Sequence, residues 1–259
     1  MNEYLSYKTF RNYTYSNDKF CKKPFKGLVV QFHGCGDTDV FNEDINGTVI
    51  TNNNKTHAQK VGEIYAEQGI LYIVPYTTPW NWMDDKTAEF VDDLVSVLLE
   101  EYGLKDFPIA STGPSMGGLG GLMYTIKSKH QDKIIVCSVN CPVADLVSQF
   151  ENSDGTRRTI LTKFYDSGDK FIETVKAHSP IHNVDKFPNI GYHLFHCGKD
   201  TAVSLENTER LYNAMKEQGL EVTYHVDPDR GHCQLTKELG DLYRGYVIEA
   251  FNNFKGFNK

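Results

Sequence analysis

The chain has 259 residues and no linker that divides it, so we expect one domain over residues 1–259 with a single core. Hydrophobic residues make up 40% of the sequence and charged residues 24%, which is typical of a globular protein and excludes a disordered or fibrous chain. The net charge of -7, without any block of basic residues, argues against nucleic acid as a partner.

The compartment is predicted from what the sequence does not contain. No apolar run approaches the roughly 18 residues that a membrane span needs, so we expect no membrane partner. Residues 1–10 lack the basic and apolar parts of a signal peptide. The six cysteines are scattered without a Cys-x-x-Cys pair, which favours free thiols. We therefore expect a cytoplasmic protein, although a protein that had lost a secretion signal would give the same pattern.

Strand-like apolar runs alternate with segments of helical period along the chain. The Tyr- and Phe-rich residues 4–20 predict one or two edge strands, as in an antiparallel hairpin. Further strands are predicted at residues 27–33, 70–74, 108–112, 133–140, 190–197 and 222–226, and helices at residues 56–68, 84–102, 116–129, 205–218 and 239–254. Residues 142–188 are polar and broken into short helical pieces, and we interpret them as a small cap insertion. This alternation predicts an α/β fold with a mostly parallel sheet flanked by helices.

The sequence Gly-Pro-Ser-Met-Gly at residues 113–117 fits the pattern Gly-x-Ser-x-Gly between a predicted strand and a predicted helix. Such a turn forces the serine backbone into a strained conformation and exposes its hydroxyl above the sheet. Ser115 is therefore the candidate nucleophile. A simple tight turn or a phosphate-binding loop would also be rich in glycine, but no lysine follows the glycines where a phosphate loop needs one.

A serine needs a base, and His232 is the best placed of the nine histidines because it follows the last predicted strand in a polar loop. The acid that orients this imidazole is predicted to be Asp200, which follows the strand at residues 190–197 and precedes His232 in the chain. Asp145, Asp227 and Asp229 are the alternative acids.

An oxyanion in acyl transfer needs two peptide N–H donors. One is predicted to be Met116, and the other Gly34 or Cys35 in the glycine-rich loop after the first parallel strand. His33 in this loop is expected to order the loop and border the substrate. Residues 37–55 and 77–83 also follow strands and should border the site. Trp80 and Trp82 either stack on a sugar or aromatic group of the substrate or pack as core.

Together these residues resemble the α/β-hydrolase superfamily, in particular the branch that contains esterases and prolyl-oligopeptidase-like enzymes such as acetyl, feruloyl and xylan esterases. The resemblance runs from the loop at residues 33–34 through residues 113–118 and 198–200 to His232. Pro114 departs from the commonest pattern, in which a less restricted residue precedes the serine. The resemblance implies an α/β-hydrolase fold and an acyl-enzyme mechanism without a metal or an organic cofactor.

We therefore expect a serine carboxylic ester hydrolase that removes small acyl groups, such as acetyl or feruloyl-like groups, from carbohydrate or plant-derived esters. The neutral imidazole that such an enzyme needs predicts a loss of activity below about pH 6 to 7. A serine peptidase of the oligopeptidase type, a thioesterase and a binding module that kept the hydrolase fold are the alternatives. The sequence does not decide the oligomeric state.

Overall fold

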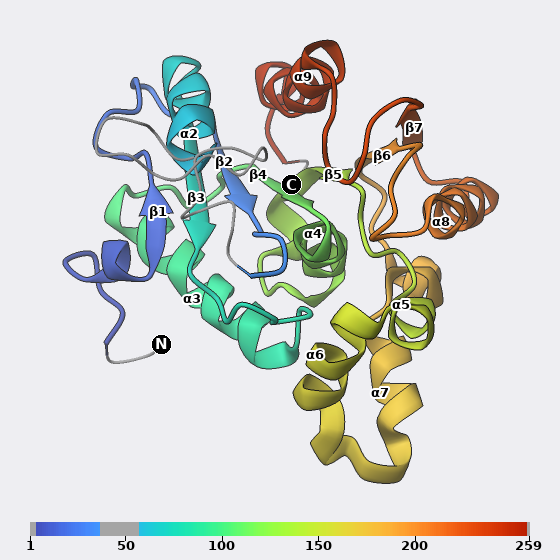
Figure 1. The fold of residues 1–259 in the computed structure, drawn as a ribbon. Coiled ribbons are helices and arrows are strands. Elements are labelled where there is room, and N and C mark those ends of the chain that lie inside the picture. The colour runs from blue at the N-terminus through green and yellow to red at the C-terminus, as the bar shows by residue number, and fades with distance from the viewer. Residues whose placement is uncertain (1–3, 37–56, 258–259) are drawn as a thin grey trace, which may run out of the picture.

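The computed structural model describes residues 4–36 and 57–257, and Figure 1 shows their arrangement as a twisted sheet covered by helices. The sheet has seven strands in the order β1-β3-β2-β4-β5-β6-β7. Its strands are β1 (Thr14–Ser16), β2 (Gly27–Gln31), β3 (Ile70–Pro75), β4 (Ile109–Pro114), β5 (Ile134–Asn140), β6 (Gly191–Cys197) and β7 (Val222–Asp227). Only β1 runs antiparallel to its neighbour, so the predicted mostly parallel sheet is confirmed.

Helices connect the parallel strands and cover both faces of the sheet. The α-helices are α2 (His57–Glu67), α3 (Asp85–Glu101), α4 (Met116–Lys127), α5 (Leu146–Asn152), α6 (Asp154–Phe164), α7 (Phe171–Ala177), α8 (Leu205–Glu217) and α9 (Lys237–Asn253). Short 3₁₀ helices are η1 (Phe10–Asn12), η2 (Gln131–Lys133), η3 (Tyr165–Lys170) and η4 (Pro180–Lys186). Within the described residues, no helix combines the length and the apolar character needed to cross a membrane.

The central strands are buried on both faces, as their nearly continuous apolar sequences predict. In β2, Leu28 and Val30 pack into the core shared with α3 and α4. Val29 points to the opposite face, where it packs with side chains of α2 and α9. Because successive residues of a strand face opposite sides, an apolar run without polar alternation requires a helix layer on each side.

Within the described residues 4–36, the N-terminal region contains one of the one or two predicted edge strands but forms no hairpin. Only one three-residue strand, β1, forms there, and it pairs with β3. The aromatic residues around it pack onto helices and neighbouring side chains instead: Phe10 is buried in the core, and the Tyr13 ring lies edge-on to Phe90 of α3, with the ring centroids 6.3 Å apart. Of the alternating aromatic residues, Tyr15 thus lies in a paired strand, whereas Phe10 and Tyr13 pack against the core and α3.

Residues 142–188 contain α5, α6, α7, η3 and η4, which pack on one another beside the sheet (Figure 1). This segment joins β5 to β6 and protrudes from the body of the molecule at the carboxyl ends of the parallel strands. Its helical content agrees with the sequence pattern, and its role as a cap stays a prediction.

Candidate active site

Ser115 stands at a sharp turn between β4 and α4. Its backbone has φ 56° and ψ -124°, a conformation that residues with a side chain rarely adopt. Hydrogen bonds fix the turn from both sides: Ser115 N donates to Asn140 O at 2.9 Å, and Val143 N donates to Ser115 O at 3.2 Å. Such strain costs about 1–3 kcal/mol and persists where the surrounding structure enforces it, as at many active sites.

Glycines on both sides of the serine allow the backbone segments to approach closely. A Cβ atom added to Gly113 would lie 2.3 Å from Gly117 O, and one added to Gly117 would lie 2.1 Å from Phe32 O. Both oxygens belong to the backbone and cannot move aside without a shift of the chain. The turn and the loop after β2 therefore pack directly against each other, which brings Cys35 to the same pocket as Ser115.

His232 and Asp200 form a hydrogen-bonded pair. His232 Nδ1 lies 2.6 Å from Asp200 Oδ2, and the Asp200 side chain is fully buried. The other carboxylate oxygen accepts the backbone N–H groups of Ala202 and Val203 at 2.8 Å and 3.0 Å. A carboxylate at Nδ1 favours the tautomer that carries a proton on Nδ1 and a free electron pair on Nε2.

A second histidine, His196, also contacts the carboxylate of Asp200. His196 Nε2 lies 3.4 Å from Asp200 Oδ2, and its Nδ1 lies 3.0 Å from Thr208 Oγ1 in a fully buried environment. Burial alone would raise the pKa of Asp200, but hydrogen bonds from His196, His232 and the Val203 N–H hold it well below its usual range. Asp200 is therefore ionised at any pH at which the protein would work.

The same contacts act on His232. Burial lowers its pKa, but the hydrogen bonds to Asp200 and Cys141 outweigh burial and raise the pKa to about 9. A base must be neutral to accept a proton. The alkaline position of this pKa moves the expected loss of activity upward from the pH 6 to 7 expected of an ordinary imidazole.

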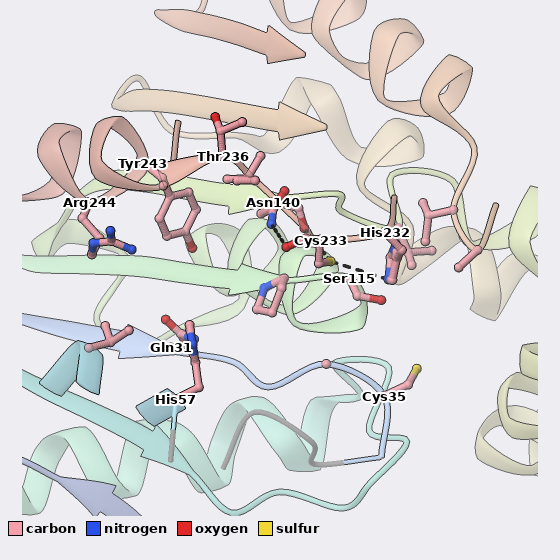
Figure 2. A pocket seen from close by; sticks show the side chains of 18 of the residues that line it. Gln31, Cys35, His57, Ser115, Asn140, His232, Cys233, Thr236, Tyr243 and Arg244 are labelled. Carbon is pink, nitrogen blue, oxygen red and sulfur yellow. Dashed lines mark hydrogen bonds between the residues drawn. The ribbon is translucent and has the colours of Figure 1, made fainter. Parts of the chain in front are cut away.

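Ser115 and His232 line one pocket of about 620 Å³, and Figure 2 shows their side chains next to each other at one end of it, away from His57 and Arg244. In the described part of the chain no hydrogen bond joins Ser115 Oγ to His232, whose Nε2 instead lies 3.5 Å from Cys233 Sγ. Contacts between a nucleophile and its base often tighten only when substrate is bound. The structure thus brings the three predicted residues into one site.

The residues predicted to donate to the oxyanion lie at or next to this pocket. Gly34 and Cys35 line it, and Met116 begins α4 directly after Ser115. Within the described residues, the N–H groups of Met116 and Cys35 make no hydrogen bond. The N-terminus of a helix carries a partial positive charge, which favours a developing anion at this point.

The two tryptophans take different positions. Trp82 is fully buried, lines the pocket beside Ser115, and its Nε1 donates to Thr159 Oγ1 of α6 at 3.1 Å. Trp80 is 50% exposed and lines a separate, smaller pocket with residues of α6 that include Arg158. Trp82 is thus both core and pocket wall, whereas Trp80 presents its ring to solvent.

The expectation that His33 borders the substrate is corrected by the structure. Its side chain is 1% exposed and is absent from the pocket lining. Its Nδ1 lies 2.7 Å from Gly34 O, and its Nε2 lies 2.5 Å from Thr77 Oγ1. Because both ring nitrogens are engaged within the protein, His33 orders the loop. Residues 37–55, also expected at the site, lie outside the described residues.

Sequence reasoning missed His196 and two cysteines beside the base. Cys141 follows β5, and Cys233 follows His232; their backbones have φ values of 46° and 58°. Cys233 N donates to Cys141 Sγ at 3.3 Å, and one ligand atom from each of Cys141, His232 and Cys233 lies within 4.8 Å of the others. Their positions after the ends of parallel strands could have predicted this cluster, because such ends meet at one edge of the sheet.

The runner-up acids do not contact the base. Asp145 caps α5 and pairs with Arg210, while Asp227 accepts the backbone N–H of Thr236. Asp229 pairs with Lys199 on the surface. The only carboxylate bonded to His232 among the described residues is that of Asp200.

Comparison with solved structures shows the same fold in several hydrolases. The chain is similar to an acylaminoacyl peptidase of Pyrococcus horikoshii (TM-score 0.58, 15% identity, 90% of this chain and 36% of that one). It is similar to an esterase of Pyrococcus furiosus (TM-score 0.60, 18% identity, 91% of this chain and 86% of that one). It is also similar to lipase A of Candida antarctica (TM-score 0.63, 11% identity, 90% of this chain and 71% of that one). The chain spans only 34% to 38% of the first three structures that it resembles.

At the level of sequence, no curated protein matches the chain. The family model described as the prolyl oligopeptidase family matches residues 81–250, which include the predicted nucleophile, acid and base. The match covers more than half of the chain, and the solved structures confirm the predicted α/β-hydrolase fold. The chain therefore belongs to the prolyl oligopeptidase family of serine hydrolases.

Proposed function

We propose that the protein is a carboxylic ester hydrolase in which Ser115 is the nucleophile, His232 the base and Asp200 the residue that orients the base. One observation carries this proposal: the strained Ser115 turn and the His232–Asp200 pair open into the same pocket. A binding protein of the same fold would gain nothing from a buried carboxylate that fixes the tautomer of an imidazole beside a serine.

The proposed reaction has two halves. Ser115 Oγ attacks the ester carbonyl carbon while its proton passes to His232 Nε2, a position now in contact with Cys233 Sγ. The oxygen of the tetrahedral intermediate accepts the N–H groups of Met116 and Cys35. His232 then gives the proton to the leaving alcohol, and the acyl group stays on Ser115. Water repeats the sequence, with His232 as base, and releases the acid.

The substrate is proposed to be a small acyl ester. Trp82, Val143 and Val203 line the pocket that contains Ser115, and their apolar side chains suit a short or aromatic acyl group such as acetyl or feruloyl. The half-exposed Trp80 in the neighbouring pocket offers a stacking surface for a sugar or plant-derived alcohol.

A peptidase is the second candidate, because acylaminoacyl peptidases share the fold. Both kinds of enzyme occur among the similar structures: the chain spans 86% of the Pyrococcus furiosus esterase and 36% of the Pyrococcus horikoshii peptidase. A panel of acetylated xylan, feruloylated sugars and dipeptide amides separates the two. Faster turnover of the amides than of the esters would favour the peptidase.

The nucleophile is tested with Ser115→Ala and short p-nitrophenyl esters. We expect kcat/KM to fall by about 10³- to 10⁶-fold, because the acyl-enzyme step is lost and only binding and the oxyanion donors remain. Ser96→Ala is the matched control, since Ser96 lies on α3 and its hydroxyl bonds to Asp92 O outside the pocket. A fluorophosphonate should label the unchanged protein and the control but not Ser115→Ala. Full activity in a folded Ser115→Ala protein would refute the assignment.

A further inference from the structure

The two cysteine thiols beside His232 take no part in the proposed ester hydrolysis steps, yet both sulfur atoms lie within 4.8 Å of a ring nitrogen of His232. Cys233 Sγ lies 3.5 Å from His232 Nε2, and Cys233 N donates to Cys141 Sγ. Cys233 Sγ in turn donates to Asn140 O at 3.9 Å, next to Cys141. Each thiol therefore contacts the backbone beside the other, and Figure 2 shows Cys233 against His232.

We propose that Cys141, Cys233 and His232 form a binding site for a thiophilic divalent cation, Zn²⁺ in the first place, which inhibits the enzyme reversibly. Two sulfur ligands and one imidazole are a ligand set that Zn²⁺ prefers. The inhibitory part of this inference rests on the proposed function, because it requires His232 to be the base. The binding part does not.

The spacing of the ligand atoms fits tetrahedral zinc. With Zn–S and Zn–N bonds of about 2.3 Å and 2.0–2.1 Å, neighbouring sulfur and nitrogen ligands lie about 3.5 Å apart and two sulfurs about 3.8 Å apart. The observed distance from Cys233 Sγ to His232 Nε2 is 3.5 Å, and all three ligand atoms lie within 4.8 Å of one another. The upper bound of 4.8 Å exceeds the sulfur–sulfur spacing of a zinc site by about 1 Å, so small side-chain movements would complete the site.

The surroundings of His232 suit a metal ligand. Histidines that bind zinc usually donate their other ring N–H to a carboxylate, which fixes the tautomer and makes the ligand nitrogen more basic. Asp200 accepts from Nδ1 at 2.6 Å, so Nε2 is the nitrogen left for the ion. Because His232 and Cys233 line the pocket together with Ser115, the fourth position of a tetrahedral ion would face this pocket and take water.

Binding and hydrolysis exclude each other. The electron pair of His232 Nε2 that would take the proton of Ser115 is the pair that would bind the ion. Ion binding also releases protons, because a cysteine binds a metal ion as the thiolate. Affinity should therefore rise with pH.

The test is a titration of the full-length, reduced protein with Co²⁺, which reports thiolate ligands by a charge-transfer absorption, followed by displacement with Zn²⁺. We expect one equivalent of tetrahedral Co²⁺ with this absorption, an affinity that rises with pH, and loss of the absorption in both Cys141→Ala and Cys233→Ala. Both variants keep a Cβ at their positive φ, so they test the thiols and not the backbone. Cys21→Ala, which removes a thiol in the N-terminal region, is the control.

Ester hydrolysis is then measured at increasing Zn²⁺, each protein being compared with its own rate without metal. We expect Zn²⁺ to inhibit the unchanged protein and the Cys21→Ala protein, and at least a tenfold higher concentration to be needed in the two other variants. A Co²⁺ spectrum without thiolate bands, or equal spectra in all variants, would overturn the site. Acceleration by Zn²⁺ would overturn inhibition. Normal Co²⁺ spectra together with an active Ser115→Ala protein would overturn the proposed function and leave the metal site standing.

Discussion

Hydrogen bonds from both sides hold Ser115 in its unusual backbone conformation. The cost should be visible in stability. Ser115→Ala keeps a Cβ at φ 56° and therefore keeps the strain, whereas glycine adopts this conformation freely.

We predict that Ser115→Gly unfolds with a free energy about 1 kcal/mol higher than Ser115→Ala. The relief of about 1–3 kcal/mol of strain exceeds the roughly 0.4–1 kcal/mol that glycine adds to the entropy of the unfolded chain. Urea unfolding of the two inactive variants measures the difference. An alanine variant at least as stable as the glycine variant would show that the turn is not strained.

The pKa of His232 sets the pH dependence of the proposed reaction. Because the base must be neutral and its pKa lies at about 9, kcat/KM should rise from neutral pH to about pH 9. Asp200→Asn removes a hydrogen bond that raises this pKa, so its profile should shift toward the ordinary imidazole value of about 6.5.

Asp200→Asn should also lower kcat by about 10⁴-fold, because an amide no longer fixes the tautomer of His232. The rate of p-nitrophenyl acetate hydrolysis between pH 5 and pH 10 measures both effects. Asp229→Asn is the control, since Asp229 pairs with Lys199 on the surface and should leave the profile in place. An unchanged profile in Asp200→Asn would contradict the role of Asp200.

Chain order was enough to predict that His232 and Asp200 lie together near Ser115, because the carboxyl ends of successive parallel strands meet at one edge of the sheet. It was not enough for His196, Cys141 and Cys233. Cys141 and Cys233 are 92 positions apart and meet only where β5 and the loop after β7 come together. No local pattern encodes such a contact, and the positive φ of both cysteines has no signature in the sequence.

At the scale of elements, α4 has to lie unusually close to the loop after β2. We predict that Gly117→Ala destabilises the protein by several kcal/mol, because the new methyl group would collide with Phe32 O and His33 O.

Gly245→Ala is the matched control in another helix. Nothing lies within 4 Å of a Cβ at Gly245, so alanine should stabilise α9 by about 0.5–1 kcal/mol through its helix propensity. Thermal unfolding of both variants gives the comparison. If Gly117→Ala destabilised the protein no more than Gly245→Ala does, α4 and the loop after β2 would not be in close contact in solution.

The parallel strands and the long helices could be predicted to within a few residues, because burial on both sides of a sheet gives continuous apolar runs and glycines end the helices. The extent of the N-terminal strand could not. Phe10 packs into the core and Tyr13 packs against Phe90 of α3, so only Thr14–Ser16 forms a strand, and alternation does not separate these two uses of an aromatic side chain.

For the whole molecule, stability and activity should depend on pH in opposite ways. The depressed pKa of Asp200 stabilises the fold above about pH 4 and loses this contribution as pH falls. The raised pKa of His232 stabilises the fold below about pH 6.5 and loses its contribution as pH rises through about 9.

We therefore predict the highest melting temperature between about pH 4 and pH 6.5, below the pH range of greatest activity. Thermal unfolding across this range tests it. His232→Gln should remove the alkaline decline, because the group that loses its proton is gone. A melting temperature of the unchanged protein that stays constant from pH 6 to pH 9 would contradict the pair's contribution.

The short strand β1 closes one edge of the sheet, and Asn17 extends its effect. Asn17 is fully buried, accepts the N–H of Tyr72 at 2.8 Å through Oδ1, and donates through Nδ2 to Ile70 O at 3.0 Å. Its side chain thus occupies backbone groups of β3 that a neighbouring strand would otherwise pair with. Without this cover, the apolar strand β3 would present an open edge that other chains could join. We therefore expect the N-terminal region, which does not line the pocket of Ser115, to limit aggregation through this edge.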